Sequence, residues 1–254
     1  MNLIVLAAGK GSRLGSHTKK IPKVLIPLVN DKTILDYHML NANAEPAIAK
    51  TIVVSGFGDE YIRSFVNSHP AAKRVDILFN PFYGFSGPLG SLWMVGDKYL
   101  SEDFIICNGD TFFGSDFLVK LSRISEPGMY LGIDRSAEVQ EDDMKVILEE
   151  DKIKEVSKKI PSEMAEAIST GMLMVKGESF RTRFFDALYT LVHEERNIKN
   201  NTPWHQLVNT LSGQVNATDM TGMAWHEVDT PEDLGSCVRL LHGKELISTN
   251  GHGE

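Results

Sequence analysis

The sequence predicts an α/β protein built on one open sheet that helices cover on both faces. Short apolar runs rich in β-branched residues alternate with stretches of helical periodicity over most of the chain. Glycine-containing turns follow two of these runs, at 3–7 and 104–107. A chain of 254 residues, 42% of them hydrophobic, is long enough to bury the core of such a sheet.

The first half of the chain has the pattern of four strands separated by three helices. Strands are expected at 3–7, 51–55, 75–79 and 104–107, and helices at 33–45, 59–68 and 89–99. The helices are long enough to serve as the crossovers that parallel strands need. Because ligands of such sheets bind beyond the carboxyl ends of the strands, the turns at 8–22 and 108–110 should meet in one crevice.

The second half has shorter strands before a long helix. Strands are expected at 129–134, 145–148, 153–156 and 171–175, and helices at 178–195, after Pro203 and from Pro231. In the first of these helices, apolar residues lie close to one face and indicate core packing: Phe180, Phe184, Leu188, Leu191 and Val192.

Composition and charge indicate a soluble intracellular protein. Two cysteines, Cys107 and Cys237, cannot form a disulfide framework, and the cytoplasm is therefore the expected location. The apolar run at 3–7 lacks the basic start of a signal peptide, and no run approaches the roughly twenty apolar residues of a membrane helix. The net charge of -8 argues against nucleic acid as a partner.

Basic residues near the amino terminus are the most informative feature of the sequence. The first thirty residues contain no carboxylate but five cations: Lys10, Arg13, Lys19, Lys20 and Lys23. These cations surround Gly9 and Gly11, which follow the first predicted strand. Glycines let backbone N–H groups approach phosphate oxygens, while Arg and Lys side chains neutralise the phosphate charge. The segment therefore predicts a triphosphate cradle.

Two common phosphate-binding motifs do not fit this segment. The dinucleotide fingerprint needs a third glycine and an immediate helix, but Leu14 occupies the relevant position and a lysine-rich stretch containing Pro22 follows. The Walker motif fails because no Gly-Lys-Ser/Thr ends the loop. Residues 8–22 are therefore expected to form a flexible lid and not the start of a helix.

Three segments resemble a known enzyme family. Leu-Ala-Ala-Gly-Lys-Gly-Ser-Arg at 6–13, followed by Pro22-Lys23, resembles the signature of the nucleotidyltransferases that activate sugar phosphates and phosphocholine. Gly109-Asp110 and Glu-Val-Asp-Thr-Pro-Glu-Asp-Leu at 227–234 resemble two acidic segments of the same family.

The resemblance implies a Rossmann-like, open, mixed and mostly parallel sheet flanked by helices, of nucleotide-diphospho-sugar transferase type, with a small acceptor-binding subregion. It implies one domain at 1–246, with a nucleotide half at about 1–126 and an acceptor and metal half at about 127–246. Residues 247–254 are expected to form a disordered tail.

The resemblance also implies the catalytic residues. Arg13 would bind the leaving β- and γ-phosphates, and Lys23 the α-phosphate and the incoming oxygen. Asp110 and Asp229 would bind a Mg²⁺ ion, which prefers carboxylate and phosphate oxygens. The nucleotide-binding residues would be Leu6, Ala7, Ala8, Gly9, Gly11, Ser12, Arg13, Lys23, Gly90, Ser91 and Asp110.

Two further segments resemble the branch of the family that transfers CMP from CTP to phosphocholine or small phosphonates and releases pyrophosphate. They are Asp-Asp-Met-Lys-Val at 142–146 and Ser-Lys-Lys at 157–159. Their lysines would bind the acceptor's phosphate or phosphonate as point charges, and two tryptophans would contact a quaternary ammonium. The acceptor-binding residues would be Lys145, Lys158, Thr170, Gly171, Trp204 and Trp225.

Other interpretations remain open. Thr170-Gly171 and the Leu-Gly-Ser element at 89–91 are also typical of enzymes that make nucleotide sugars from sugar 1-phosphates. A catalytically silent nucleotide-binding regulatory module is a second alternative. Asp229 could serve only as a helix N-cap, and the tryptophans could serve only as core residues. The sequence also leaves a homodimer open.

Overall fold

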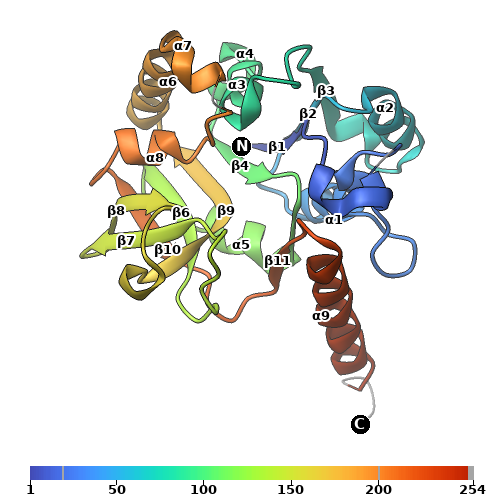
Figure 1. Cartoon of the computed structure of the whole chain (residues 1–254). Helices are drawn as coiled ribbons and strands as arrows, with labels where there is room; N and C mark the ends of the chain where they lie inside the picture. Colours follow the sequence, from blue (N-terminus) through green and yellow to red (C-terminus); the bar gives the residue numbers. More distant parts are fainter. Residues whose placement is uncertain (19, 200, 251–254) are drawn as a thin grey trace.

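Nine strands form one mixed sheet in the part of the chain that the structure describes (Figure 1). This computed structural model describes residues 1–18, 20–199 and 201–250. The strands are β1 (Asn2–Ala7), β2 (Lys50–Ser55), β3 (Val75–Phe79), β4 (Phe104–Asn108), β6 (Gly128–Asp134), β7 (Lys145–Glu149), β8 (Lys152–Ser157), β9 (Ala167–Lys176) and β10 (Val215–Asp219). Their order is β3-β2-β1-β4-β9-β6-β10-β8-β7. The predicted α/β class is confirmed.

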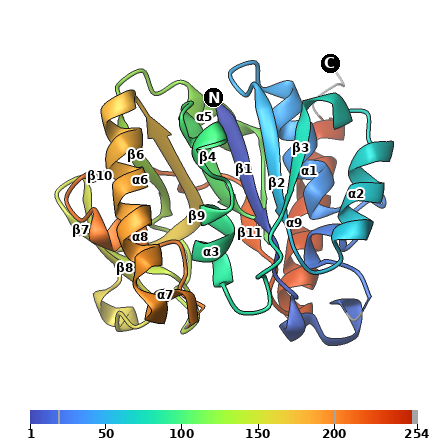
Figure 2. The same ribbon diagram turned by 90° about the horizontal axis from the view of Figure 1, so that it is seen from above.

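The pairing changes from parallel to antiparallel across the sheet. β1 pairs in parallel with β2 and β4, and β2 pairs in parallel with β3; these strands lie side by side in Figure 2. Beyond β4, β10 is parallel to β6, but β9 is antiparallel to β4, β6 and β7, and β8 is antiparallel to β7 and β10. The expectation of a mostly parallel sheet is therefore wrong for the second half. Its strands include a pair, β7 and β8, joined by a turn too short for a parallel crossover.

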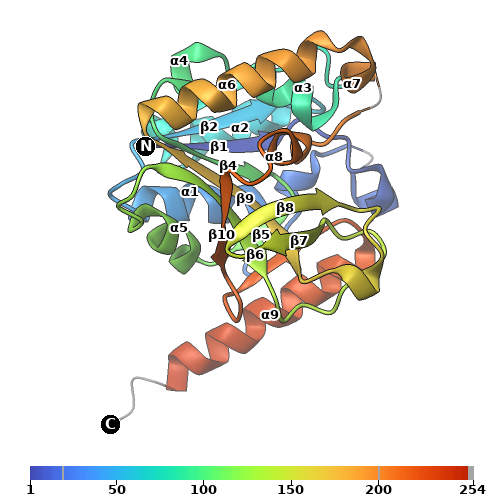
Figure 3. The same ribbon diagram turned by 90° about the vertical axis from the view of Figure 1, so that its left-hand side faces the viewer.

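Helices cover both faces of this sheet. They are α1 (Ile34–Ala44), α2 (Asp59–Ser68), α3 (Gly87–Trp93), α4 (Asp97–Leu100), α5 (Ser115–Ser122), α6 (Glu178–His193), α7 (Glu195–Lys199), α8 (Gln206–Thr210) and α9 (Pro231–Asn250). Figure 3 shows α3, α4 and α6 on one side of the sheet, with α1 and α5 on the other. Among the described residues, no helix combines the length and apolar composition needed to cross a membrane.

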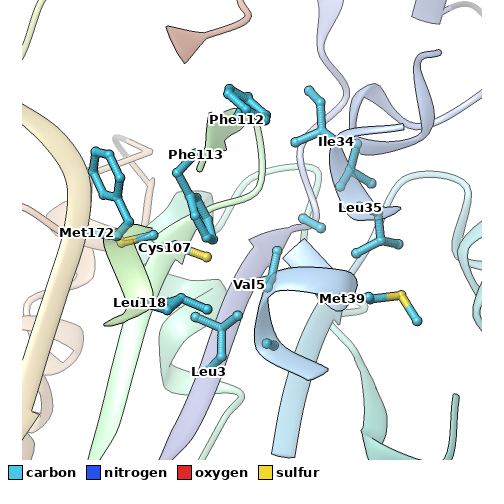
Figure 4. Packing of buried hydrophobic residues seen from close by; sticks show 14 of the residues in the cluster. Leu3, Val5, Ile34, Leu35, Met39, Cys107, Phe112, Phe113, Leu118 and Met172 are labelled. Atoms are coloured by element: carbon cyan, nitrogen blue, oxygen red, sulfur yellow. The ribbon is translucent and has the colours of Figure 1, made fainter. Parts of the chain in front are cut away.

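The alternation of side chains along the strands produces two cores. Leu3 and Val5 of β1 belong to the cluster beneath α1 and α5, whereas Ile4 belongs to the cluster beneath α3 and α6. Figure 4 shows the first cluster, whose labelled members come from six strands and helices and are at most 3% exposed: Leu3, Val5, Ile34, Leu35, Met39, Cys107, Phe112, Phe113, Leu118 and Met172. The core packing predicted for α6 is confirmed, because Phe184, Leu188 and Leu191 are buried in the second cluster.

Several elements differ from the sequence-based expectation. The helix expected at 89–99 divides into α3 and α4, because Gly96 between them has a φ of 65°. The loop at 8–22 contains a 3-10 helix at Ser12–Thr18, kinked at Gly15. α9 includes residues 247–250, which the sequence predicts to lie in the tail, since no proline follows Pro231 to end the helix. Residues 251–254 and Lys19 lie outside the described residues.

A small second sheet joins the middle of the chain to its last third. β5 (Thr111–Phe113) pairs antiparallel with β11 (Trp225–Glu227), and the N–H of Val228 donates to the carbonyl of Asp110 at 2.9 Å. The sequence did not predict β5, because three residues are too few to show a period. This pairing places residues 110 and 229 beside each other, although 118 residues separate them in the chain.

His38 and Asn41 of α1 hold the other edge of β5. Nε2 of His38 donates to the carbonyl of Thr111, and Nδ2 of Asn41 donates to the carbonyl of Phe113, each at 2.8 Å. Burial lowers the pKa of His38 to about 4, although the hydrogen bond to Thr111 and the charge of Asp110 oppose the change. The ring is therefore neutral at pH 7.

The His38→Gln variant should lose part of the acid sensitivity of the fold. The unfolded chain protonates His38 below pH about 6.5, whereas the folded chain resists protonation down to a pKa of about 4. The free energy of unfolding therefore falls by roughly 3 kcal/mol on this account as the pH drops through that interval, and Gln removes this contribution. Urea unfolding in EDTA at several pH values measures how steeply the free energy of unfolding changes with pH. His193→Gln, at an exposed position, is the control, and an unchanged slope in His38→Gln would contradict the prediction.

Candidate active site

A pocket of about 770 Å³ opens at the carboxyl ends of β1 and β4. The turn after β1 contributes Ala8, Gly9, Gly11 and Ser12, and the turn after β4 contributes Gly109 and Asp110. The expectation that these two turns meet in one crevice is confirmed. The predicted site residues that line the pocket are Leu6, Ala7, Ala8, Gly9, Gly11, Ser12, Arg13, Lys23, Ser91, Asp110, Lys158, Trp204 and Asp229.

Two glycines allow the turns to approach so closely. The N–H of Gly109 donates to the carbonyl of Leu6 at 3.0 Å, and a Cβ on Gly109 would lie only 2.5 Å from that oxygen. Gly11 has a φ of 61°, and a Cβ there would lie 2.9 Å from the Cβ of Lys23. Both positions therefore exclude larger residues on steric grounds.

Lys23 joins the two predicted metal ligands. Its ammonium Nζ lies 2.9 Å from Oδ2 of Asp110 and also donates to Oδ1 of Asp229. The residue is only 8% exposed, so its charge depends on these partners. Burial by itself lowers the pKa of Lys23, but the nearby carboxylates of Asp110 and Asp229 outweigh it and hold this pKa above its ordinary value.

Arg13 extends the same network across the pocket. Its Nη2 lies 2.6 Å from Oδ2 of Asp229, and its Nη1 donates to Oδ2 of Asp142. Oδ1 of Asp142 in turn accepts from Nζ of Lys158 at 2.7 Å. Burial lowers the pKa of Arg13, but the hydrogen bond to Asp142 and the charge of Asp229 raise it above its ordinary value. The network links the amino-terminal loop with the β7–β8 hairpin.

Glu227 is a third carboxylate that sequence reasoning did not assign. One ligand oxygen each from Asp110, Glu227 and Asp229 lies within 4.8 Å of the other two. Burial, followed by the charges of Asp110 and Asp229, raises the pKa of Glu227. The sequence did contain a signal for Glu227. It lies two residues before Asp229, and residues two apart in an extended segment project to the same side.

The carboxylate cluster has the donor set of a divalent metal site. Hard cations such as Mg²⁺ bind oxygen ligands, and carboxylates are their usual protein donors. Once Glu227 is ionised, the three carboxylates carry more negative charge than the ammonium of Lys23 and the guanidinium of Arg13 balance between them, and a bound cation would favour this ionised form. Asp110, Glu227 and Asp229 therefore fit a bound cation in both chemistry and charge.

Trp204 and His205 form one wall of the pocket. Trp204 is 1% exposed, and its ring stacks on His205 with centroids 3.9 Å apart. Its Nε1 donates to Oδ1 of Asn108 at 2.7 Å, which ties the wall to the end of β4. His205 and Asn108 also line the pocket. His205 was missed because it belongs to no segment of recognisable pattern, whereas Asn108 lies in the predicted turn at 108–110 but was given no role. Trp204 thus contributes both core packing and pocket lining.

Five predicted residues are not among the described residues that line the pocket. Lys145 is 2% exposed, and its ammonium donates to backbone carbonyls instead. Trp225 donates through Nε1 to Asp134 at 2.9 Å. Thr170 is buried within β9, and Gly171, with a φ of 73°, provides room for the side chain of Asn108.

Gly90 is the fifth of these residues, and it has a packing role inside α3. A Cβ on Gly90 would lie 2.4 Å from the Cβ of Ser86. The neighbouring Ser91 does line the pocket, and Nδ2 of the buried Asn80 donates to the hydroxyls of both Ser86 and Ser91. Asn80 thereby fixes the start of α3 against the pocket.

Comparison with known families identifies the scaffold. Residues 3–131, half of the chain, match the family model of the MobA-like NTP transferase domain. The chain belongs to this family. The match includes the turns after β1 and β4, so the NTP transferase scaffold accounts for the half of the pocket that holds Lys23 and Asp110.

Individual relatives of this NTP transferase are distant. It is 26% identical over 262 residues to the bifunctional protein GlmU of Methanococcus maripaludis, and the alignment covers 99% of this chain and 57% of that protein. It is 25% identical over 239 residues to CMP-5'-(3-aminopropyl)phosphonate synthase of Streptomyces rubellomurinus, and the alignment covers 91% of this chain and 37% of that protein. The chain therefore spans little more than half, or less, of these relatives.

Solved structures support the fold. CTP:phosphocholine cytidylyltransferase from Streptococcus pneumoniae matches with a TM-score of 0.71 and 16% identity, over 94% of this chain and 98% of the other. This similarity assigns the NTP transferase chain to the nucleotide-diphospho-sugar transferase fold.

Gly109→Ala should destabilise this NTP transferase and displace Asp110. The added methyl group would overlap the carbonyl of Leu6, so the pairing of the two turns must open. We expect the free energy of unfolding to fall by about 1–3 kcal/mol, as for other strained backbone positions. Gly84→Ala is the matched control because no heavy atom lies within 4 Å of the Cβ position there. Guanidinium unfolding measures both variants, and equal stability of the two would contradict the prediction.

Proposed function

We propose that this protein is a Mg²⁺-dependent cytidylyltransferase that transfers CMP from CTP to a small phosphate or phosphonate acceptor and releases pyrophosphate. The observation that carries the proposal is the convergence of Lys23 with Asp110 and Asp229 at the edge of a pocket built on the glycine turn. Residues from three distant segments thus supply both signs of charge where a triphosphate would lie.

In the proposed reaction an acceptor oxygen attacks the α-phosphorus of CTP. The new O–Pα bond forms as the bond from Pα to the bridging oxygen of the β-phosphate breaks, and pyrophosphate leaves with that electron pair. The acceptor oxygen is already anionic at neutral pH, so no general base is needed. The protein must instead bring two anions together, which it can do by positioning and charge neutralisation.

Two cations suit this task. Arg13 is half-exposed at the mouth of the pocket and has two nitrogens in hydrogen bonds with carboxylates, a fork that also fits the leaving phosphates. Lys23 is buried closer to the glycine turn, where its single ammonium would contact the α-phosphate and the incoming oxygen. Both cations must exchange a carboxylate partner for substrate.

The carboxylates would hold the metal. Asp110 and Asp229, with Glu227 beside them, are the residues that would bind Mg²⁺. When bound, the ion supplies positive charge to the phosphate oxygens. Glu227, whose pKa is raised by burial and by its acidic neighbours, would be ionised more readily with a cation nearby.

The choice of CTP and of the acceptor rests on two supports. One relative is a CMP-(3-aminopropyl)phosphonate synthase, and its alignment extends over most of this chain. Lys158, from the segment that resembles the phosphocholine and phosphonate branch, lines the pocket beside Lys159. A sugar-1-phosphate nucleotidyltransferase is the alternative that the same scaffold would serve.

A panel of substrate pairs tests the proposal. The protein is mixed with Mg²⁺, one of the four NTPs or dTTP, and phosphocholine, 2-aminoethylphosphonate or a hexose 1-phosphate, and pyrophosphate is measured. We expect release with CTP and a small phosphate or phosphonate, and loss of release when EDTA replaces Mg²⁺. Release with hexose 1-phosphates alone would favour the alternative. No release with any pair would indicate a silent nucleotide-binding module.

Lys23→Ala and Asp110→Asn should each lower the rate of pyrophosphate release by about 10²–10³, on the pattern of single electrostatic groups in other enzymes. Lys20→Ala is the control, because that lysine belongs to the same segment but is exposed and is not among the described residues that line the pocket. Steady-state rates with the best substrate pair measure the effect. Near-normal rates in either variant would contradict the assigned roles.

A further inference from the structure

Asp142 is not among the described residues that line the pocket, but it links two cations that do, Arg13 and Lys158. Its Oδ2 accepts from Nη1 of Arg13 and its Oδ1 accepts from Nζ of Lys158 at 2.7 Å. Arg13 belongs to the loop after β1, whereas Lys158 directly follows β8. The side chain of Asp142 is 59% exposed. Among the described carboxylates, it is the one that forms ion pairs both with a cation from residues 1–126 and with a cation from residues 127–246.

The backbone around Asp142 is held by a buried lysine. The ammonium of Lys145 donates to the carbonyl of Glu141 at 2.7 Å, to that of Asp143 at 3.5 Å and to that of Lys158 at 2.9 Å. One charge therefore fixes the residues on both sides of Asp142 together with the backbone of Lys158. Asp142 is a pre-positioned group, because its neighbours cannot shift without unpairing a buried ammonium.

Substrates would take both partners of Asp142. Under the proposed function the triphosphate binds Arg13 and the acceptor's phosphate binds Lys158. A carboxylate would then remain beside two groups of phosphate oxygens, and like charges in such contact are unfavourable. A cation on the acceptor would restore the balance at this point.

We infer that Asp142 is a specificity-determining residue that selects acceptors with a cationic amine close to the phosphorus. This inference rests on the proposed function and names the acceptor class of the same pocket. Asp142 holds Arg13 and Lys158 before substrates arrive and binds the acceptor's amine afterwards. An acceptor without a positive charge leaves Asp142 facing the phosphates and is disfavoured.

The geometry also limits the length of the acceptor. Oδ1 of Asp142 and Nζ of Lys158 are 2.7 Å apart, and each would bind its ligand atom at about 2.8 Å. The amine and a phosphate oxygen of one acceptor can therefore lie at most about 8 Å apart while each contacts its partner. A linker of about two or three carbons between phosphorus and nitrogen meets this requirement.

The test compares 2-aminoethylphosphonate with 2-hydroxyethylphosphonate, which has the same length and no positive charge. Wild-type protein and Asp142→Asn are assayed for kcat/KM with CTP, and binding of each acceptor in the presence of CTP is measured by calorimetry. We expect wild type to prefer the amine by about tenfold or more, and Asp142→Asn to lose most of this preference. Glu141→Gln is the control, since it removes the adjacent charge but leaves the carbonyl for Lys145, and it should keep the preference.

The outcomes separate this inference from the proposed function. Equal use of the two acceptors by wild type, or an amine preference that survives in Asp142→Asn, overturns the role of Asp142 and leaves cytidylyl transfer standing. Absence of pyrophosphate release, with an amine preference in calorimetry that Asp142→Asn abolishes, supports the role of Asp142 and contradicts the proposed function. Absence of both release and preference overturns both. Thermal unfolding of Asp142→Asn should match wild type, because the side chain is exposed.

Discussion

The ion pairs of Lys23 with Asp110 and Asp229 are the interaction on which the rest of the site depends. A lysine that is 8% exposed cannot remain charged without partners, and here the partners come from the end of β4 and from the segment after β11. The buried ammonium therefore constrains three distant parts of the chain to one place. Removing one partner would leave charge uncompensated in a poorly solvated position.

Backbone pairing delivers these partners. β5 follows Asp110 directly, and its pairing with β11 carries the chain to Asp229. The side chains of His38 and Asn41, both in α1, donate hydrogen bonds to carbonyls of β5, so this three-residue strand is held on both edges. A strand of three residues contributes little stability by itself. The hydrogen bonds from His38 and Asn41 therefore take the place that a second neighbouring strand would have in a larger sheet. The arrangement couples the candidate metal ligands to the core beneath α1.

Carboxylates of the same chain pair with three of the described cations that line the pocket. Lys23 is bound to Asp110 and Asp229, Arg13 to Asp229 and Asp142, and Lys158 to Asp142. A polyanionic ligand must displace these partners, so its binding energy includes the cost of exchanging one ion pair for another. Selectivity can then arise from how well a ligand satisfies the carboxylates it releases, in addition to how well it binds the cations.

The sequence determined much of this protein by local rules. Runs of β-branched residues and helical periods gave most strands and helices, and the excess of cations around Gly9 and Gly11 predicted a phosphate site at the end of β1. Arg13, Lys23, Asp110 and Asp229 were assigned because each lies in a segment that resembles part of the family signature. Each of these patterns is local and can be read in the sequence, whereas the contacts between the four residues depend on the fold.

Only the tertiary structure decided the remainder. The antiparallel second half, the three-residue β5 and the place of Glu227 depend on pairing between distant segments, for which a short strand carries no period. Lys145 had the residue type of an anion-binding group, yet the fold buries it among backbone carbonyls, while the unassigned Asp142 bridges Arg13 and Lys158. Residue type sets what a side chain can bind, but burial and the groups that surround it decide what it does bind.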